Sequence, residues 1–312
     1  MDPVVVVGAG LAGLSAAREL SREGVPVVVL DRGRRVGGRM ASRRTDGRPV
    51  DIGASYLTVS DPGFEAVVTD WERRGLAHPW TDTFDVDAPD GRSRRSGPVR
   101  WAAGRGLRSL VEDLAEGLDV RQVTVEQVDG GRHVAGLDAS AVVLAMPDPQ
   151  ARRLLGPSLS AERELLDVDS EPVLALTAWW GERVWAELDG VFVNDDPVLS
   201  WVADDGRRRG DGAPVLVAHS TPALAREHLD TPDDAAPAML RTLARVVGTD
   251  VAPETTSVHR WTFARPTGGH GRSFHLSDGL VGFCGDAWSD KPRVEAAWVS
   301  GTALARELVS RL

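Results

Sequence analysis

The sequence predicts an α/β protein in which a parallel sheet covered by helices carries an inserted antiparallel sheet. The apolar run 3–7 leads through a glycine-rich turn into a helical pattern over 14–20, and a second apolar run follows over 25–30. This order is typical of a β-α-β unit, whose parallel strands are buried on both faces. The middle of the chain contains short apolar runs without such helices, and 280–312 returns to a strand and a helix.

Strand and helix patterns alternate along the rest of the chain. Two turn signals predict β-hairpins, namely Pro89-Asp90-Gly91 within 80–101 and Asp129-Gly130-Gly131 within 120–134. The arginine-rich segment 206–212 is predicted to be a solvated loop, as most runs of like charge are. Apolar spacing predicts the remaining helices over 64–74, 106–116, 235–247 and 294–312, and the remaining strands over 141–145, 172–180, 199–203, 215–219, 256–263 and 280–284.

Composition excludes several classes of function. The net charge of -10 argues against binding of a nucleic-acid backbone, which needs a basic face. No apolar run approaches the roughly 18 residues of a membrane span, and Met1-Asp2-Pro3 has no basic leader, so we expect a cytoplasmic protein. The single cysteine, Cys284, excludes an internal disulfide framework, and no metal-binding motif predicts a metal site.

A glycine fingerprint follows the first apolar run. Gly8, Gly10 and Gly13 have the G-x-G-x-x-G spacing, with a strand before them and a helix after them. The first glycine allows a tight turn, the second a close approach of backbone to a pyrophosphate, and the third close helix–strand packing. Asp31 ends the second strand, where a carboxylate accepts hydrogen bonds from ribose hydroxyls. The chain is therefore predicted to bind a dinucleotide, with Leu11, Ala12 and Arg32 also at the site.

The next segment indicates which dinucleotide is bound. The stretch 35–42, Arg-Val-Gly-Gly-Arg-Met-Ala-Ser, resembles the R-x-G-G-R-x-x-S signature of the glutathione-reductase-like flavoproteins of the amine-oxidase group. Ordinary nicotinamide-binding domains lack it. The resemblance implies non-covalent FAD, whose phosphate an arginine can reach with charge-assisted donors. It places at the cofactor Gly37, Gly38, Arg39, Met40, Gly53, Ala54, Ser55 and Val123.

The C-terminal segment resembles the second flavin site of the same group. It contains Gly282-Phe283-Cys284-Gly285-Asp286, and a helical stretch from Arg293 to Gly301 follows. A helix N-terminus stabilises the negative charge that a reduced flavin develops. The resemblance implies that Gly285, Asp286, Arg293, Val294 and Ala297 contact FAD. Without it, Asp286 is equally well explained as a turn residue or a helix cap.

These motifs imply a discontinuous domain organisation. The fold class is a glutathione-reductase-like FAD-binding Rossmann domain with an inserted antiparallel β-sheet plus helix substrate domain. We expect the FAD-binding domain to comprise 1–75, 101–150 and 256–312, and the substrate domain to comprise 76–100 and 151–255. The active site is expected at the domain interface, over the flavin.

Further segments are similar to the renalase family, particularly its bacterial members. They are Asp51 to Tyr56, His259-Arg260-Trp261, Ala264-Arg265-Pro266, and the C-terminal motif. The resemblance spans almost the whole chain and is least informative over 155–255. It implies an FAD-dependent oxidase that takes hydride from misreduced, isomeric dihydronicotinamide dinucleotides and passes the electrons to O2. The products are NAD(P)+ and hydrogen peroxide, and the partners are the dinucleotide substrate and O2.

Two alternatives stay open at this stage. A flavin amine oxidase or desaturase is one, although the only lysine, Lys291, lies in the C-terminal loop and not on the strand where monoamine-type relatives carry one. Two residues depart from the renalase pattern. Bacterial renalases carry glutamine at the position of Ser55 and phenylalanine at the position of Leu57. A non-enzymatic protein that uses FAD structurally is the other alternative.

Five residues are candidates for the substrate pocket. Tyr56 is the only tyrosine, and His259 is the only histidine of seven within a candidate site segment, although a packed or surface role is the more common one for such a histidine. Arg265 could meet a substrate phosphate or form a structural salt bridge. Cys284 does not match a flavin-linking position and is expected to be a small buried strand residue. The predicted catalytic set is Tyr56, His259, Trp261, Arg265 and Trp288.

Overall fold

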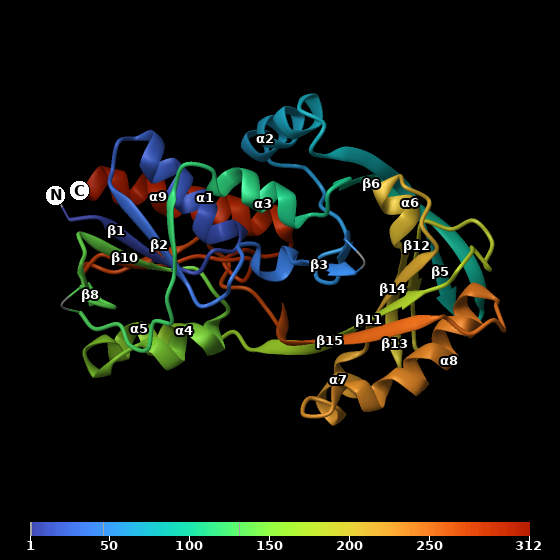
Figure 1. The fold of residues 1–312 in the computed structure, drawn as a ribbon. Helices are drawn as coiled ribbons and strands as arrows, with labels where there is room; N and C mark the ends of the chain where they lie inside the picture. The colour runs from blue at the N-terminus through green and yellow to red at the C-terminus, as the bar shows by residue number, and fades with distance from the viewer. Residues whose placement is uncertain (1, 46, 131) are drawn as a thin grey trace.

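The computed structural model describes residues 2–45, 47–130 and 132–312. Two domains lie side by side along the length of the molecule, and both chain ends lie at the far end of one of them (Figure 1). None of the helices in the described ranges combines the length and the apolarity needed to cross a bilayer.

A six-stranded sheet forms the centre of the first domain. Its strand order is β16-β17-β10-β1-β2-β7, and all of its pairings are parallel except that of β16 with β17. Helices α1, α3 and α9 cover one face, and α4 and α5 cover the other (Figure 1). The strands are β1 Val4–Val7, β2 Val27–Asp31, β7 Asp119–Gln122, β10 Ala141–Leu144, β16 His275–Leu276 and β17 Val281–Phe283. The helices are α1 Leu11–Arg22, α3 Arg108–Ala115, α4 Asp148–Leu154, α5 Ser160–Leu165 and α9 Val294–Arg311.

Strand β1 shows why this sheet is continuously apolar. Its four valines are all buried, with Val4 and Val6 in the core below α1 and α9, and Val5 and Val7 in the core facing α4. Because successive side chains point to opposite faces, a strand covered on both sides must be apolar at every position. The predicted β-α-β unit is confirmed.

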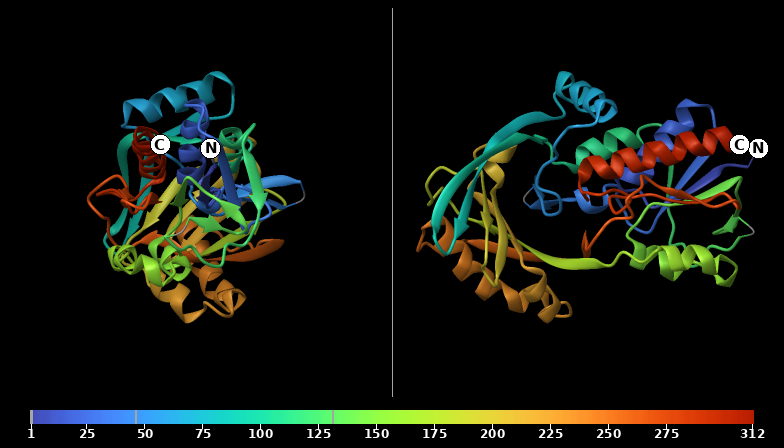
Figure 2. Two further views of the ribbon diagram at one scale, coloured as in Figure 1. Left: turned by 90° about the vertical axis from the view of Figure 1, so that its left-hand side faces the viewer. Right: turned by 180° about the vertical axis from the view of Figure 1, so that it is seen from behind.

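A seven-stranded sheet forms the second domain, in the order β15-β11-β14-β13-β12-β5-β6. Only the pairing of β12 with β5 is parallel. Helices α7 and α8 pack on its outer face (Figure 2), where Leu174 and Leu176 of β11 share a hydrophobic core with Met239 and Leu243 of α8. The strands are β5 His78–Ala88, β6 Gly91–Ala102, β11 Ser170–Trp179, β12 Gly190–Val193, β13 Leu199–Asp204, β14 Val215–Ser220 and β15 Thr255–Pro266. The predicted fold class is confirmed.

The remaining elements are short connections and surface helices. They include a two-stranded pair, β3 Ser42–Thr45 with β4 Arg48–Asp51, which lies where the two domains meet (Figure 1). The others are α2 Pro62–Arg73, β8 His133–Val134, β9 Leu137–Asp138, α6 Asp205–Arg209, α7 Pro222–Glu227, α8 Ala236–Val247, and the 3-10 turns Gly38–Met40, Pro157–Leu159 and Pro232–Ala235.

One of the two predicted hairpins has the predicted turn. Strands β5 and β6 pair with Ala88 opposite Gly91, so their turn is the predicted one. In the second segment, the antiparallel pair is instead β8 with β9, which flank Ala135 and Gly136. Val128, near the turn predicted there, makes only a parallel bridge to Leu155. Gly131 of that predicted turn lies outside the described residues.

The observed sheets differ from the predicted domain boundaries at two places. Strand β15, predicted to belong to the FAD-binding domain, pairs with β11 at the edge of the seven-stranded sheet. Residues 151–166, predicted to belong to the substrate domain, contribute Ala151, Leu155 and Leu159 to the core of the parallel sheet. Both differences arise because β11 and β15 form one long antiparallel ribbon that leads from one domain to the other (Figure 1).

The prediction of a solvated arginine loop over 206–212 is wrong. Residues Asp205–Arg209 form helix α6, in which Arg208 is 1% exposed and Arg209 6% exposed. Asp204 caps this helix by accepting a hydrogen bond from the backbone N–H of Arg207, and Gly210 ends it in the left-handed conformation. The two buried guanidinium groups point away from solvent, toward the parallel-sheet domain.

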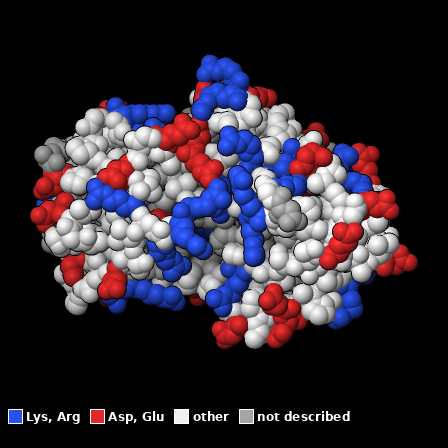
Figure 3. All heavy atoms as spheres, in the orientation of Figure 1, with Lys and Arg blue, Asp and Glu red and all other residues white. Residues whose placement is uncertain are grey.

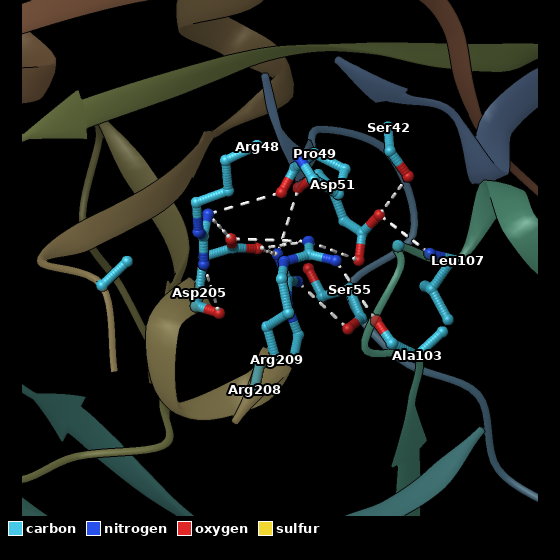
Figure 4. A network of polar contacts seen from close by, with 12 residues as sticks. Ser42, Arg48, Pro49, Asp51, Ser55, Ala103, Leu107, Asp205, Arg208 and Arg209 are labelled. Carbon is cyan, nitrogen blue, oxygen red and sulfur yellow. Dashed lines mark hydrogen bonds and ion pairs between the residues drawn. The ribbon is translucent and has the colours of Figure 1, made fainter. Parts of the chain in front are cut away.

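A buried polar network holds these arginines (Figure 4). Asp205 pairs with Arg48, Arg208 and Arg209, and its side chain is fully buried. Arg208 also donates to the carbonyl oxygens of Ser55 at 3.1 Å and Asp51 at 3.2 Å. Arg209 donates to the carboxylate of Asp51 at 3.3 Å. Helix α6 of the second domain is thereby joined to β4 and the segment that follows it in the first.

We predict that Asp205→Asn strongly destabilises the protein. The substitution leaves three arginines around a neutral side chain, and removing one partner from a buried ion pair typically costs about 3–5 kcal/mol. Urea denaturation measures the change in the free energy of unfolding. The control is Asp119→Asn, which removes the partner of Arg121 in an exposed pair and should have little effect. Equal stability of the two variants would contradict the structural role of the network.

The same network predicts a dependence on pH. Burial acts to raise the pKa of Asp205, but Arg208, Arg209 and Arg48 outweigh it and hold the pKa well below its usual range. The stabilisation is therefore complete above the ordinary carboxyl pKa of about 4 and is lost as the pH falls below it.

Candidate active site

A cavity of about 1140 Å³ lies where the two domains meet. It exceeds the range of about 300–1,000 Å³ that is usual for small-molecule pockets, so it has room for a dinucleotide and a second molecule. The parallel-sheet domain supplies one part of its wall, and β11, β12, β13, β14 and β15 supply the other.

The glycine turn forms one end of the cavity. Gly8 has φ +111°, a conformation that favours glycine, and a Cβ on Gly13 would lie 1.9 Å from the carbonyl oxygen of Gly8. Gly13 therefore lets α1 pack closely on the turn and does not itself line the cavity. Gly10 does line it, and a Cβ there would meet no protein atom closer than 4.0 Å. The missing side chain at Gly10 therefore leaves space in the cavity and is not required for packing within the protein.

Asp31 lies on the cavity wall at the end of β2. Its two carboxylate oxygens accept hydrogen bonds from the backbone N–H groups of Ala9 at 2.6 Å and Gly33 at 2.7 Å. These bonds hold the carboxylate beside the glycine turn, and each oxygen retains acceptor capacity for a ribose hydroxyl. Arg32 and Val123 lie next to it on the wall.

Arg39 joins the two halves of the predicted cofactor site. Its guanidinium group forms a bidentate pair with Asp286, with Nη1–Oδ2 at 3.0 Å and Nη2–Oδ1 at 2.5 Å. This geometry is the strong, orienting form of an arginine–carboxylate pair. It connects the segment after β2 to the segment after β17, although 247 residues separate them in sequence. Gly53 lies against this segment so closely that a Cβ would lie 1.9 Å from the carbonyl oxygen of Arg39.

Helix α9 begins at the wall of the same cavity. Arg293 is its N-cap residue, without a side-chain cap, and Val294 and Ala297 line the cavity. Glu295 turns away and accepts hydrogen bonds from the backbone of Ser60 at 2.5 Å and Asp61 at 2.7 Å. The other predicted cofactor residues that line the cavity are Leu11, Ala12, Gly37, Gly38, Met40, Ala54, Ser55 and Gly285.

Aromatic side chains surround the part of the cavity nearest the second domain. Tyr56 packs against Phe84 and Trp201, with ring centroids 5.3 Å and 5.9 Å away. The indole N–H of Trp201 donates to Ser55 Oγ at 2.9 Å, which fixes the position of this ring relative to β4. Burial raises the pKa of Tyr56, so its phenol stays protonated at neutral pH. Phe192 completes this aromatic wall.

Three further predicted residues line the cavity on β15. The indole N–H of Trp261 donates to the carbonyl oxygen of Ile52 at 2.8 Å, and His259 stands edge-on to Trp261. Burial lowers the pKa of His259, and the positive charges of Arg43 and Arg260 lower it further. Arg265 faces the cavity, and burial lowers its pKa. Among the described residues Arg265 forms no ion pair, since Glu171 on the paired strand binds Arg226.

Trp288 was predicted to belong to the substrate pocket, but it does not line the cavity. Its side chain is 2% exposed and belongs to the core of the parallel sheet, outside the cavity wall. It stacks on His270 with ring centroids 3.8 Å apart, and His270 is held by Asp148 at 2.8 Å. The carboxylates of Asp148 and Asp167 and the ring of His270 lie near one another outside the cavity.

His219 is a wall residue that the sequence reasoning missed. It lies on β14, is buried, and lines the cavity, where its Nε2 has no hydrogen-bond partner among the described residues. Burial, together with Arg265 and Arg208, lowers the pKa of His219 to about 3, so its ring is neutral at physiological pH. The one available signal was a histidine directly after the apolar run 215–218.

Cys284 agrees with its predicted role as a packed residue. It is fully buried and does not line the cavity, and burial raises the pKa of its thiol to about 12. A protonated thiol without access to the cavity is a poor candidate for a covalent link to a cofactor.

Comparison with known families assigns a class to this Rossmann-type sheet and the antiparallel sheet over it. Residues 6–71 match the model of the NAD(P)-binding Rossmann-like domain. Residues 80–309, well over half of the chain, match the model of flavin containing amine oxidoreductases. The chain belongs to this amine oxidoreductase family, and the predicted enzyme class and the cofactor FAD are confirmed.

Curated relatives match parts of the chain. A protein of Mycobacterium tuberculosis provisionally named flavin-containing monoamine oxidase is 48% identical over 113 residues, which are 36% of this chain and 22% of that protein. Phytoene desaturase of Rhodobacter capsulatus is 37% identical over 136 residues, 43% of this chain and 24% of the desaturase. The chain thus aligns with less than a third of the length of these curated relatives.

Solved structures resemble the whole fold. Cyclohexylamine oxidase from Brevibacterium oxydans superposes with a TM-score of 0.81 at 14% identity, and putrescine oxidase with 0.75 at 18%. Each alignment covers 99% of both chains. At this level of identity the likeness concerns the fold.

The residues present fit FAD. A glycine turn open to the cavity, a carboxylate at the end of β2, and the unpaired N-terminus of α9 supply what a ribose, a pyrophosphate and a flavin ring need. Arg32, Arg39 and Arg293 lie along the same wall, where Arg39 is paired with Asp286 and Arg293 with Glu295.

We predict that Gly10→Ala lowers the FAD content of the purified protein without unfolding it. The added methyl group meets no protein atom but enters the space that a pyrophosphate would occupy. The ratio of flavin to protein absorbance measures the loss, and circular dichroism checks the fold. Gly268→Ala is the control, because a Cβ there also meets nothing and the residue does not line the cavity. Unchanged FAD content in Gly10→Ala would exclude the glycine turn as the cofactor site.

Proposed function

We propose that the protein is an oxidase that takes hydride from isomeric dihydronicotinamide dinucleotides. The renalase resemblance supports the proposal, and the charge of the cavity supports it independently. When bound, FAD supplies the acceptor for the hydride and passes two electrons to O2, which leaves with two protons as hydrogen peroxide. The dinucleotide leaves as NAD(P)+.

In this proposal the wall of the first domain binds FAD. The glycine turn and Arg39 would hold the pyrophosphate, and Asp31 the ribose of the adenosine half. The start of α9 would point at the flavin ring. The proposed contacts are Gly8, Gly10, Leu11, Ala12, Asp31, Arg32, Gly37, Gly38, Arg39, Met40, Gly53, Ala54, Ser55, Val123, Gly285, Asp286, Arg293, Val294 and Ala297, with Gly13 in support.

One observation carries the choice of substrate: the described part of the cavity wall supplied by the second domain presents the guanidinium group of Arg265 and no carboxylate, whereas the guanidinium group of Arg260 donates to the carbonyl oxygen of Leu229. Among the described residues, the only carboxylates on the cavity wall are Asp31 and Asp286, both on the first domain, and Asp286 is paired with Arg39. The second domain contributes Arg260 and Arg265 and no carboxylate.

This charge favours an anionic substrate over a cationic one. A dinucleotide carries a pyrophosphate that Arg265 can bind, whereas a protonated amine would approach the positive charge of Arg265. Tyr56, His259 and Trp261 would position the dihydropyridine ring. Hydride transfer from such a ring yields an aromatic cation and needs no general base, which accords with the low pKa of His219.

Oxidation of an amine is the second candidate function. The family model and the name of the Mycobacterium tuberculosis relative favour it. The aromatic wall of Tyr56, Phe192 and Trp201 would accommodate an apolar amine. In contrast to the monoamine-type relatives, no lysine lines the described cavity wall, which argues against this candidate.

An anaerobic titration separates the two candidates. We expect isomeric dihydronicotinamide dinucleotides to bleach the visible flavin band of the purified protein rapidly, because they combine a hydride donor with the charge that the cavity binds. Amines and ordinary NADH serve as comparison donors. Bleaching by amines alone would replace the proposal with the second candidate, and a flavin that no donor reduces would contradict both.

We predict that Arg265→Gln weakens dinucleotide binding selectively. The loss of one charged hydrogen-bond donor to a phosphate should raise the Kd of the dinucleotide roughly tenfold. Reduction by the corresponding phosphate-free riboside should change little. Stopped-flow reduction at varied donor concentration measures both donors, and Arg95→Gln on β6 is a control of equal charge. Equal weakening of both donors would show that Arg265 does not meet a phosphate.

A further inference from the structure

A second, smaller cavity lies on the surface of the first domain, away from the cofactor wall. It has a volume of about 150 Å³ and is bounded by the segment after β2, the β3–β4 pair and the start of α3. This volume suits a compact ion with a few water molecules and not a dinucleotide. Four arginines line it, namely Arg35, Arg44, Arg105 and Arg108.

The local charge is opposite to that of the whole chain. Four arginines and one acid, Glu112, line the cavity, which leaves three net positive charges on a protein whose net charge is -10. Figure 3 shows basic side chains gathered near the middle of this face, over the region of β3 and α3. Since like charges brought together cost free energy, such a cluster indicates a site that an anion completes.

Most of this positive charge lacks a protein partner. Arg35 pairs with Glu112 at 2.8 Å, but Arg44, Arg105 and Arg108 form no ion pair among the described residues. The Nε of Arg108 is buried and makes no hydrogen bond there. Burial lowers the pKa of Arg108, and the charge of Arg35 lowers it further.

Nearby hydroxyl groups are already used within the protein. Ser42 Oγ donates to Asp51 at 2.5 Å and accepts from the backbone N–H of Arg108 at 3.3 Å. Ser109 Oγ donates to the carbonyl oxygen of Gly106 at 2.8 Å. A ligand would therefore be bound by guanidinium groups, whose planar forks match the oxygens of a phosphate.

We propose that this cavity binds a phosphate dianion, either free or as a phosphomonoester. Arg44, Arg105 and Arg108 would bind it from three sides, and Arg35 would lie at its edge. The side chain of Arg108 also packs behind Gly37, where a Cβ would lie 3.2 Å from its Cγ. An anion on Arg108 would thus stabilise the loop that carries Gly37 and Gly38 on the cofactor wall.

The test uses the FAD-loaded protein, so that the large cavity is filled. Inorganic phosphate is titrated by calorimetry, with chloride at equal ionic strength as the reference. We expect saturable binding at millimolar phosphate, an increase in melting temperature, and slower release of FAD. Arg44→Gln and Arg105→Gln should each raise the Kd roughly tenfold. Arg95→Gln, an exposed arginine on β6, carries the same charge change and should leave the Kd unchanged.

Two results would overturn the proposal: no saturable phosphate binding by the unmodified protein, or equal weakening by all three variants, which would indicate binding elsewhere through net charge. A parallel titration with glucose 6-phosphate identifies the source of the dianion. Tighter binding than inorganic phosphate would assign an organic phosphomonoester, and weaker binding would assign the free ion.

Discussion

The fully buried carboxylate of Asp205 is the interaction on which the shape of the active site depends. It gathers Arg48, Arg208 and Arg209 between the two domains, and Arg208 and Arg209 also bind Ser55 and Asp51. A charge taken out of water is tolerated only when its partners are fixed in place. The network therefore sets the position of the substrate sheet relative to β4, and with it the separation of the two walls of the cavity.

The Arg39–Asp286 ion pair likewise holds two distant segments of the chain together, at the predicted cofactor site. The segments after β2 and after β17 come from opposite ends of the chain, and the bidentate pair fixes one against the other. The two ion-paired clusters differ in their surroundings. The pair lies partly exposed on the wall of the large cavity, whereas Asp205 is closed to solvent.

The features that could be predicted from the sequence are those that depend on neighbouring residues. The β-α-β unit, the β5–β6 hairpin and the glycine turn follow from local periodicity and turn chemistry. Arg208 and Arg209 look like a solvated run because the groups of the other domain that bind them, at Asp51 and Ser55, are more than 150 residues away. Trp288 does not line the cavity because its ring packs in the core of the parallel sheet and stacks on His270, a contact that no local pattern predicts. His219 could not be assigned because only the order of strands in the sheet brings β14 to the cavity.

The topology of the parallel sheet also has a consequence for synthesis of the protein. Strand β10 pairs with β17, with Val142 opposite Val281, and α9 packs against α1. During translation β10 and α1 must therefore wait, without their partners β17 and α9, while strands β11 to β15 of the substrate sheet are made. A nascent chain has no complete wall for the flavin until residues 281–311 have left the ribosome. Long-range parallel pairing is slow to form, so capture of the cofactor is expected to be among the last events in maturation.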